Sequence, residues 1–190
     1  MRRIVPVTML AFALFAAVRL IAADAPAPAA AAGASPGELK FTTHNTVYNA
    51  EGSFTSWKLT KVDIPGGDLT KGTVAFEIDL ASVNEKAAKL AAHLRTADFF
   101  DVATFPKATV VIHDAKAAGE KKYEATADVD LHGMKGTCPV TFEVVSASPL
   151  TIKGAATLNR STFKVGQPYD AADKYSPVSE VAIELNAKLQ

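Results

Sequence analysis

Apolar and polar residues alternate one by one along several stretches of the chain. In residues 73–79 apolar residues occupy every second position, and the same alternation recurs in residues 123–131, 137–144 and 180–189. A strand with one apolar and one polar face is typical of an antiparallel sheet that covers a core on one side only. The pattern therefore predicts a mainly β protein.

Four further strands are expected, each bounded by clusters of Gly, Pro, Asp or Asn. They cover residues 40–48, 52–64, 107–115 and 150–158. Within residues 52–64 the apolar parity changes between Leu59 and Val62, which indicates a β-bulge or a sharp bend. Eight strands with one apolar face each are buried without open edges when the sheet closes on itself. An antiparallel eight-stranded barrel is therefore expected, and its interior is either packed by side chains or holds one slender ligand.

One short helix is expected between the strands, at about residues 82–95. Ser82 and Glu85 have the spacing of a capping box, in which hydroxyl and carboxylate satisfy amides at the helix start. The apolar residues at helical spacing are Val83, Ala87, Leu90 and Leu94. An alanine-rich helix with such a narrow apolar stripe is expected to lie across an opening of the barrel.

Asp98, Phe99, Phe100 and Asp101 follow the expected helix. The two aromatic side chains are expected to point inward. Asp98 is interpreted as a cap of a helix end or turn, and Asp101 as a partner of Arg95 or of a neighbouring amide. The rival interpretation makes the two carboxylates a general acid and a general base.

Several motifs occur together in one order. They are residues 93–102 (HLRTADFFDV), Phe105-Pro106, Leu131-His132-Gly133-Met134 leading to Val140, Asn159 to Gly166 (NRSTFKVG) and Val181 to Leu185 (VAIEL). In this order and spacing the chain, from about Leu39 onward, resembles the YceI-like family of bacterial polyisoprenoid-binding, lipocalin-like proteins. The resemblance implies a lipocalin-like antiparallel barrel whose apolar lumen receives the tail of an isoprenoid or related amphipathic lipid, without enzymatic activity.

The resemblance also implies that the inward-facing residues line this lumen. They are Phe76, Ile78, Leu94, Phe99, Phe100, Val110, Ile112, Tyr123, Val129, Val140, Phe142, Leu158, Phe163, Val181, Ile183 and Leu185. Arg160, Tyr169 and Tyr175 are expected at the ligand headgroup or the mouth of the lumen. For Arg160 two interpretations stay open: it pairs with an acid of residues 98–101, or it meets the headgroup.

The first hairpin departs from the family pattern. The family usually opens with Asp-x-His-Ser and a long first hairpin, whereas here Gly52 follows only eight residues after His44. The hairpin is therefore expected to be short, and the loop from Gln167 to Pro177 is expected to compensate as a flap over the mouth.

Candidate catalytic and metal-binding chemistry is sparse. None of the four histidines, His44, His93, His113 and His132, stands two or four residues from another, so no strand-type or helix-type metal pair is present in the sequence. A nucleophile elbow of the form Gly-x-Ser-x-Gly is also missing from the sequence. No catalytic residue, metal or cofactor is therefore expected, other than a bound isoprenoid or other lipid. The alternatives are a structural or stress-response interaction module with a solid barrel core, and a metal-dependent enzyme that uses His44 or His113.

Residues 1–23 have the pattern of a secretory signal peptide, with Arg2-Arg3, an apolar run and small residues at the exit. Cleavage before Asp24 is expected, and the rival interpretation is a membrane anchor. Residues 24–38 are rich in Ala and Pro and are expected to be a flexible linker, followed by one barrel domain over 39–190. The expected location is the periplasm or the outside of the cell.

Net charge bears on the class of partner, and the single cysteine bears on the core. Loss of residues 1–23 would remove three of the 20 Lys and Arg and none of the 20 Asp and Glu, which leaves a net charge of −3. This balance argues against nucleic acid as a partner. The expected partner is an apolar or amphipathic small molecule, and transient membrane contact and a homodimer are allowed. Cys138, the only cysteine, is expected to be a small buried hydrophobe on the apolar face of its strand.

Overall fold

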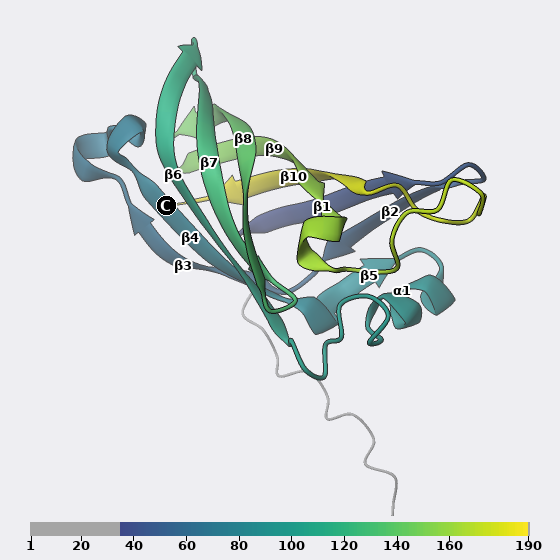
Figure 1. The fold of residues 1–190 in the computed structure, drawn as a ribbon. Coiled ribbons are helices and arrows are strands. Elements are labelled where there is room, and N and C mark those ends of the chain that lie inside the picture. The colour runs from purple at the N-terminus through teal and green to yellow at the C-terminus, as the bar shows by residue number, and fades with distance from the viewer. Residues whose placement is uncertain (1–34, 190) are drawn as a thin grey trace, which may run out of the picture.

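The computed structural model describes residues 35–189, whose strands form one antiparallel sheet that curls into a half-barrel (Figure 1). The strands are β1 Gly37–His44, β2 Asn49–Phe54, β3 Trp57–Asp63, β4 Thr73–Asp79, β5 Val83–Glu85, β6 Lys107–Gly119, β7 Lys122–Leu131, β8 Met134–Ala147, β9 Leu150–Asn159 and β10 Glu180–Lys188. The helices are α1 Ala88–Leu94 and the short 3-10 helices η1 Pro65–Gly67, η2 Leu69–Lys71, η3 Leu80–Ser82 and η4 Arg160–Phe163.

Neighbouring strands follow the order β3-β4-β6-β7-β8-β9-β10-β1-β2-β5, so β3 and β5 are the edges of the sheet. The mainly β class, the antiparallel pairing and the short helix are confirmed. The strand number is ten instead of the expected eight, and the sheet stays open between its two edges. The number differs because the stretch expected as one strand over 52–64 is divided into β2 and β3, and because β5 occupies the expected start of the helix.

Residues 55 and 56, between β2 and β3, are hydrogen-bonded to residues 79 and 82, so the two edges of the sheet meet at one end. The backbone N–H of Thr55 donates to the carbonyl of Ser82 at 3.3 Å, and the N–H of Asp79 donates to the carbonyl of Ser56 at 3.0 Å. The Ser82 hydroxyl oxygen also accepts from the Ser56 N–H at 3.1 Å. These hydrogen bonds turn the chain from one edge strand toward the other, and they account for the tight curl of the sheet at this end.

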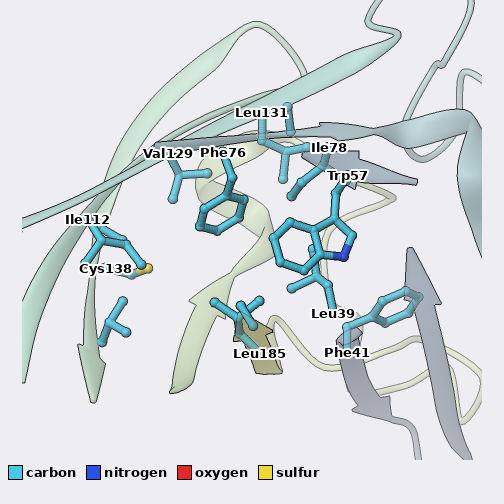
Figure 2. Packing of buried hydrophobic residues seen from close by; sticks show 14 of the residues in the cluster. Leu39, Phe41, Trp57, Phe76, Ile78, Ile112, Val129, Leu131, Cys138 and Leu185 are labelled. Atoms are coloured by element: carbon cyan, nitrogen blue, oxygen red, sulfur yellow. The ribbon is translucent and has the colours of Figure 1, made fainter. Parts of the chain in front are cut away.

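The apolar faces of the strands point into the curl, as the alternation predicts. Trp57 of β3 is only 3 % exposed, and its ring meets Phe76 of β4 edge-on with ring centroids 5.6 Å apart. Figure 2 shows the Trp57 indole between side chains of β4 and side chains of β1. The core is therefore shared by strands that are far apart in the sheet order.

Cys138 lies where the alternation of β8 predicts it. Its side chain is buried within the apolar cluster, and burial raises the pKa of the thiol. A thiol with a raised pKa is a poor nucleophile at neutral pH. The expectation of a buried hydrophobic cysteine is confirmed.

The helix begins at Ala88 instead of at about residue 82, and the capping-box prediction is wrong. Ser82 ends η3, and its hydroxyl donates to the backbone carbonyl of Asp79 at 2.6 Å. Val83 is fully buried and pairs with β2 opposite Phe54. The segment is extended because an edge strand is available to it, and capping-box spacing carries no information on such a distant partner.

Register shifts occur at four places in the described sheet: once in the β3–β4 pair, twice in the β6–β7 pair and once in the β8–β9 pair. The expected parity change in β3 is confirmed by a register shift between Leu59 and Lys61. A second shift lies in β6 between His113 and Lys116, where Asp114 has a positive φ of 55°. Bulges increase local twist and curvature, so both contribute to the curl of the half-barrel.

Several sequence predictions concern the N-terminal stretch. The expected signal peptide and residues 24–34 of the expected linker lie outside the described residues, whereas β1 already begins at Gly37. Pro36 is tied to the sheet, because its carbonyl accepts from the Lys188 N–H at 2.9 Å. Within residues 35–189 no helix is long and apolar enough to cross a membrane.

Candidate ligand-binding cavity

The half-barrel encloses one large cavity, with a volume of about 190 Å³. Its wall comes from β1, β2, β4, β6, β7, β8, β9 and β10 and from the segment that contains α1. The wall is almost wholly apolar, and its polar or charged residues are Lys40, Thr43 and Arg160. A cavity of this kind accepts an apolar ligand by removing apolar surface from water.

Most of the residues predicted to line the lumen lie in the wall of this cavity. They are Phe76, Ile78, Leu94, Phe99, Phe100, Val110, Ile112, Val129, Val140, Phe142, Leu158, Val181, Ile183 and Leu185. Their side chains come together because the alternating faces of six strands converge in the curl, and Leu94, Phe99 and Phe100 join them from the segment that contains α1. That they bind a ligand stays a prediction.

Tyr123 and Phe163 lie outside the wall of the cavity. The Tyr123 ring stacks on Phe142, with ring centroids 5.0 Å apart and an interplanar angle of 10°. Phe163, the last residue of η4, is buried against β8, and a Cβ on Gly136 of that strand would lie 2.9 Å from its ring. Both aromatic residues therefore pack behind or beside residues of the sheet instead of facing the cavity.

Sequence reasoning did not name several residues of the wall. They are Leu39, Phe41, Phe54, Leu80, Ala108, Ile152 and Val165. Leu39 and Phe41 flank Lys40 in an alternating strand, so the same periodicity identifies them. Leu80 and Val165 come from a 3-10 helix and a loop, where no periodic signal exists.

The Arg160 side chain is the most unusual group in the wall, because it is charged and only 4 % exposed. Its Nε donates to the carbonyl of Val178 at 2.9 Å, and one Nη donates to the carbonyls of Val165 at 2.9 Å and Gln167 at 2.6 Å. The other Nη donates to the carbonyl of Pro177 at 2.6 Å. The guanidinium therefore gathers both ends of the loop between η4 and β10 around itself.

The charge of Arg160 is not neutralised by an acid. None of the ion pairs found within residues 35–189 includes Arg160, so the expected pairing with an acid of residues 98–101 is wrong. Burial lowers the pKa of the Arg160 guanidinium, which remains protonated at any physiological pH. The backbone carbonyls of the loop satisfy its donors because the loop closes over the side chain. The second interpretation, contact with a headgroup, stays a prediction.

Thr43 of β1 supplies a second polar group near Arg160. Its hydroxyl oxygen is buried, lies at the wall and has no hydrogen-bond partner among the described residues. The backbone places Thr43 beside the loop that Arg160 holds, because the carbonyl of His44 accepts from the Val178 N–H at 3.0 Å. We call this region, with Thr43, Arg160 and Pro177, the Arg160 end of the cavity.

The Asp-Phe-Phe-Asp segment closes the cavity at the same end. Phe99 and Arg160 both approach Gly166, because a Cβ on Gly166 would lie 2.9 Å from the Phe99 ring and 3.0 Å from an Arg160 Nη. The Phe100 ring meets Phe54 edge-on, with ring centroids 5.6 Å apart. The inward orientation expected for Phe99 and Phe100 is therefore observed in the fold.

Arg95 fixes this segment through backbone carbonyls instead of through Asp101. Its Nε donates to the carbonyl of Ala81 at 2.8 Å, and its Nη atoms donate to the carbonyls of Ala91 and Val83. The expected pairing of Arg95 with Asp101 is wrong, because Arg95 points to η3 and β5. Asp101 instead has a positive φ of 43°, and its backbone N–H donates to the carbonyl of Thr96 in the turn after α1.

The remaining candidate residues do not form a catalytic constellation. Asp98 lies 3.6 Å from the Nε2 of His93 on the surface. Among residues 35–189 no group of three or more His, Cys, Asp or Glu side chains is arranged to hold a metal ion. Tyr169 and Tyr175 are 49 % and 57 % exposed and are not part of the wall. Their expected place at the mouth, and the flap formed by their loop, stay predictions.

The short first hairpin is present, and the loop that carries both tyrosines lies against it (Figure 1). β1 and β2 pair from Leu39 opposite Phe54 to His44 opposite Asn49. The Nδ2 of Asn45, in the hairpin turn, donates to the carbonyl of Tyr175 at 3.1 Å. The hairpin tip and this loop therefore support each other beside the Arg160 end.

Comparison with known proteins places this geometry in a family. Residues 33–189 match the family described as the YceI-like domain. A UPF0312 protein of Pseudomonas putida strain W619 is 33 % identical over 100 residues, which are 53 % of this chain and 47 % of the relative. A UPF0312 protein of Pseudomonas savastanoi pv. phaseolicola is 31 % identical over 127 residues, 62 % of this chain and 64 % of the relative. The chain thus spans about half the length of the first of these curated relatives.

Solved structures share the fold. BcnA of Burkholderia cenocepacia aligns with a TM-score of 0.70 and 24 % identity, covering 79 % of this chain and 94 % of that one. The YceI protein of Campylobacter jejuni aligns with a TM-score of 0.62 and 19 % identity, covering 77 % and 89 %. A domain of Saccharophagus degradans described as polyisoprenoid-binding and implicated in plant cell wall breakdown aligns with a TM-score of 0.56 and 19 % identity, covering 80 % and 92 %.

Proposed function

Because the chain belongs to the YceI-like domain family, we propose that it is a non-enzymatic binding or carrier protein for a polyisoprenoid or similar amphipathic lipid. The observation that carries the proposal is the apolar cavity of about 190 Å³, walled by side chains of eight strands. A structural neighbour described as a polyisoprenoid-binding domain supports the class of ligand. A solid core, which the rival structural module requires, disagrees with this cavity.

The ligand lies with its apolar tail between the strands and its polar group at the Arg160 end. Each buried methylene contributes about 0.8 kcal/mol before the costs of ordering the ligand. The Thr43 hydroxyl is buried without a partner within the described residues, and a ligand oxygen that reaches this end would satisfy it. The positive charge of Arg160, with no acid beside it, favours an oxygen-rich or anionic headgroup over a cationic one.

The first experiment identifies what the protein carries. Protein purified from the compartment in which it naturally accumulates is analysed by native mass spectrometry, followed by organic extraction and identification of small molecules. A bound prenyl lipid, or uptake of added prenols by the emptied protein, is the expected result. Repeated purification without lipid, combined with no uptake of any prenol, would overturn the proposal.

A cavity-blocking variant ties binding to the cavity. Ala156 lies in the wall on β9, between Val140 and Ile183 on the neighbouring strands. Ala156→Phe is expected to abolish prenol uptake because the larger ring occupies the space of the tail. Thr157→Phe is the matched control, because Thr157 is the next residue of the same strand and is exposed on its outer face. Equal uptake by both variants would show that the ligand binds elsewhere.

The proposal also places the protein in the periplasm or outside the cell. The pattern of residues 1–23 supports export, with a mature chain that begins at Asp24. Cell fractionation and N-terminal sequencing of the mature protein test this. An uncleaved N-terminus in the membrane fraction would favour the anchor interpretation. Transient membrane contact and a homodimer stay predictions.

A further inference from the structure

A second, smaller cavity of about 30 Å³ lies behind the main one. Ile64, Leu69 and Gly72, from the β3–β4 connection that contains η1 and η2, form one side of it, and Ala115 of β6 forms another. Three residues, Ile112, Phe142 and Ile152, belong to the walls of both cavities. They therefore separate the main cavity from the second one.

The strand register places this separation at the end of the half-barrel opposite Arg160. Ile152 of β9 lies opposite Ala187 of β10, near one end of that pairing, whereas Asn159, next to Arg160, lies at the other end. In Figure 1 the β3–β4 connection and α1 likewise lie at opposite ends of the sheet. We call the region around Ile112, Phe142 and Ile152 the Ile112 end.

The main cavity is too small to hold a long prenyl tail. Its volume of about 190 Å³ is below the ~300–1,000 Å³ of ordinary small-molecule pockets. A prenyl tail with its polar group at Thr43 and Arg160 runs along the axis of the half-barrel and meets the Ile112 end. A longer tail must enter the second cavity or remain partly in water.

We infer that Ile112, Phe142 and Ile152 form a partition that sets the length of the prenyl tail this protein accepts. The inference rests on the proposed function and adds a length limit to it. The second cavity is the space into which the tail extends when the partition is opened. Ala115 and Ile64 then line the end of the tail instead of an empty void.

The three residues of the partition differ in how firmly they are held. Phe142 is stacked on Tyr123, so that removing its ring also exposes a second aromatic ring. Ile112 is an aliphatic side chain and, at 9 % exposed, is less enclosed than Ile152 at 4 %. Ile112→Ala is therefore the substitution that opens the partition with the least change elsewhere.

The matched control is Ile78→Ala. Ile78 is an isoleucine of the same wall with similar exposure, 7 % against 9 %, but it lies outside the second cavity. Both substitutions remove the same atoms and enlarge the main cavity. Only Ile112→Ala connects the main cavity to the second one. The double variant Ile112→Ala/Ala115→Leu opens the partition and fills the space behind it.

The experiment measures dissociation constants for geraniol, farnesol, geranylgeraniol and solanesol by displacement of a fluorescent fatty acid. In the natural protein we expect affinity to rise with length and then to stop rising, which defines the limit. Ile112→Ala is expected to move the limit by about one isoprene unit and to bind the first prenol beyond it at least about tenfold more tightly, because newly buried methylenes leave water. The double variant is expected to restore the original limit.

Ile78→Ala is expected to change the affinity for all prenols by a similar factor and to leave the limit where it was. Equal shifts in Ile112→Ala and Ile78→Ala, or no shift in Ile112→Ala, would overturn the partition while the proposed function stands. A natural protein that binds no prenol of any length would overturn the proposed function, and the length limit with it. Circular dichroism and thermal melting check that each variant is folded.

Discussion

The two ends of the half-barrel are stabilised by different kinds of contact. At the Arg160 end a buried charge is surrounded by four backbone carbonyls, each of which accepts a hydrogen bond of defined direction from the guanidinium. At the Ile112 end the contacts are apolar and the packing leaves a void of about 30 Å³. Hydrogen bonds specify a single geometry, whereas apolar contacts tolerate rearrangement.

The contrast indicates where the fold is rigid and where it is adaptable. The Arg160 end holds a loop that lacks regular structure, so a strong polar centre replaces the missing sheet hydrogen bonds. At the Ile112 end the three residues of the partition lie on paired strands, whose backbone hydrogen bonds do not require close packing of every side chain. A protein that holds a ligand with a polar head and an apolar tail needs a fixed end for the head and space for the tail. The following substitutions test this contrast.

The largest effect is expected when the polar centre is removed. Arg160→Met removes the donor from four carbonyl oxygens, one in a buried and three in partly buried hydrogen bonds, and each group left unsatisfied away from water costs about 1–3 kcal/mol. Because the loop can relax toward water, we expect a total loss of about 3–5 kcal/mol in the free energy of unfolding, measured by urea denaturation. Arg160→Lys keeps the charge but not the planar set of donors, so its free energy of unfolding is expected to lie between those of the natural protein and Arg160→Met. A loss below about 1 kcal/mol in Arg160→Met would contradict this role.

A smaller effect is expected at Gly166, the glycine that Phe99 and Arg160 both approach. Gly166 has a positive φ of 73°, and a Cβ there would lie 2.9 Å from the Phe99 ring. Gly166→Ala is expected to cost about 1–3 kcal/mol, from the strained backbone and the displaced ring. Gly67→Ala is the control, because Gly67 has a φ of 77° with open space around it. If both variants lose the same stability, backbone strain alone explains the effect and the Phe99 contact does not matter.

A gain in stability is expected from filling the void. Ala115 is 7 % exposed and lines the second cavity without taking part in the partition. Ala115→Val is expected to raise the free energy of unfolding by up to about 1 kcal/mol, because it adds apolar contacts where space exists. Urea denaturation measures the change. A loss of about 1–3 kcal/mol would indicate that the site is already full.

The smallest effect concerns charge at the Ile112 end, where His113 lies between two acids. Its Nδ1 lies 3.0 Å from an oxygen of Asp114, and its Nε2 lies 3.1 Å from an oxygen of Asp128. The contact with Asp114 is the main cause of the raised pKa of His113, and Asp128 adds to it, against the effect of burial. The negative charges of the two carboxylates beside the ring favour the doubly protonated imidazolium.

This arrangement predicts a pH-dependent stability. The pKa of His113 is higher in the folded than in the unfolded protein. The stabilisation from the charged His113 is therefore complete below the unfolded pKa of about 6.5, and it is lost as the pH rises through the folded pKa. His113→Gln is therefore expected to lower stability by less than about 1 kcal/mol near pH 5, and the difference from the natural protein should shrink toward pH 9. Thermal melting across this range measures it. A difference that grows with rising pH would contradict the imidazolium.

The sequence by itself determined the antiparallel strands, the bulge after Leu59 and the buried position of Cys138. It also determined most of the cavity wall and the family. These properties follow from alternation with a period of two and from motif spacing, and both are local. A residue on the apolar face of a strand faces the core whichever strand lies beside it.

Only the tertiary structure decided the open edge between β3 and β5, the extended conformation at Val83 and the partners of Arg160. The same holds for Tyr123 and Phe163, which are apolar in pattern but pack outside the cavity. Each of these features depends on which distant segment is nearest after the sheet has curled. Such proximity is set by the path of the whole chain, and neither periodicity nor helix-capping spacing encodes it.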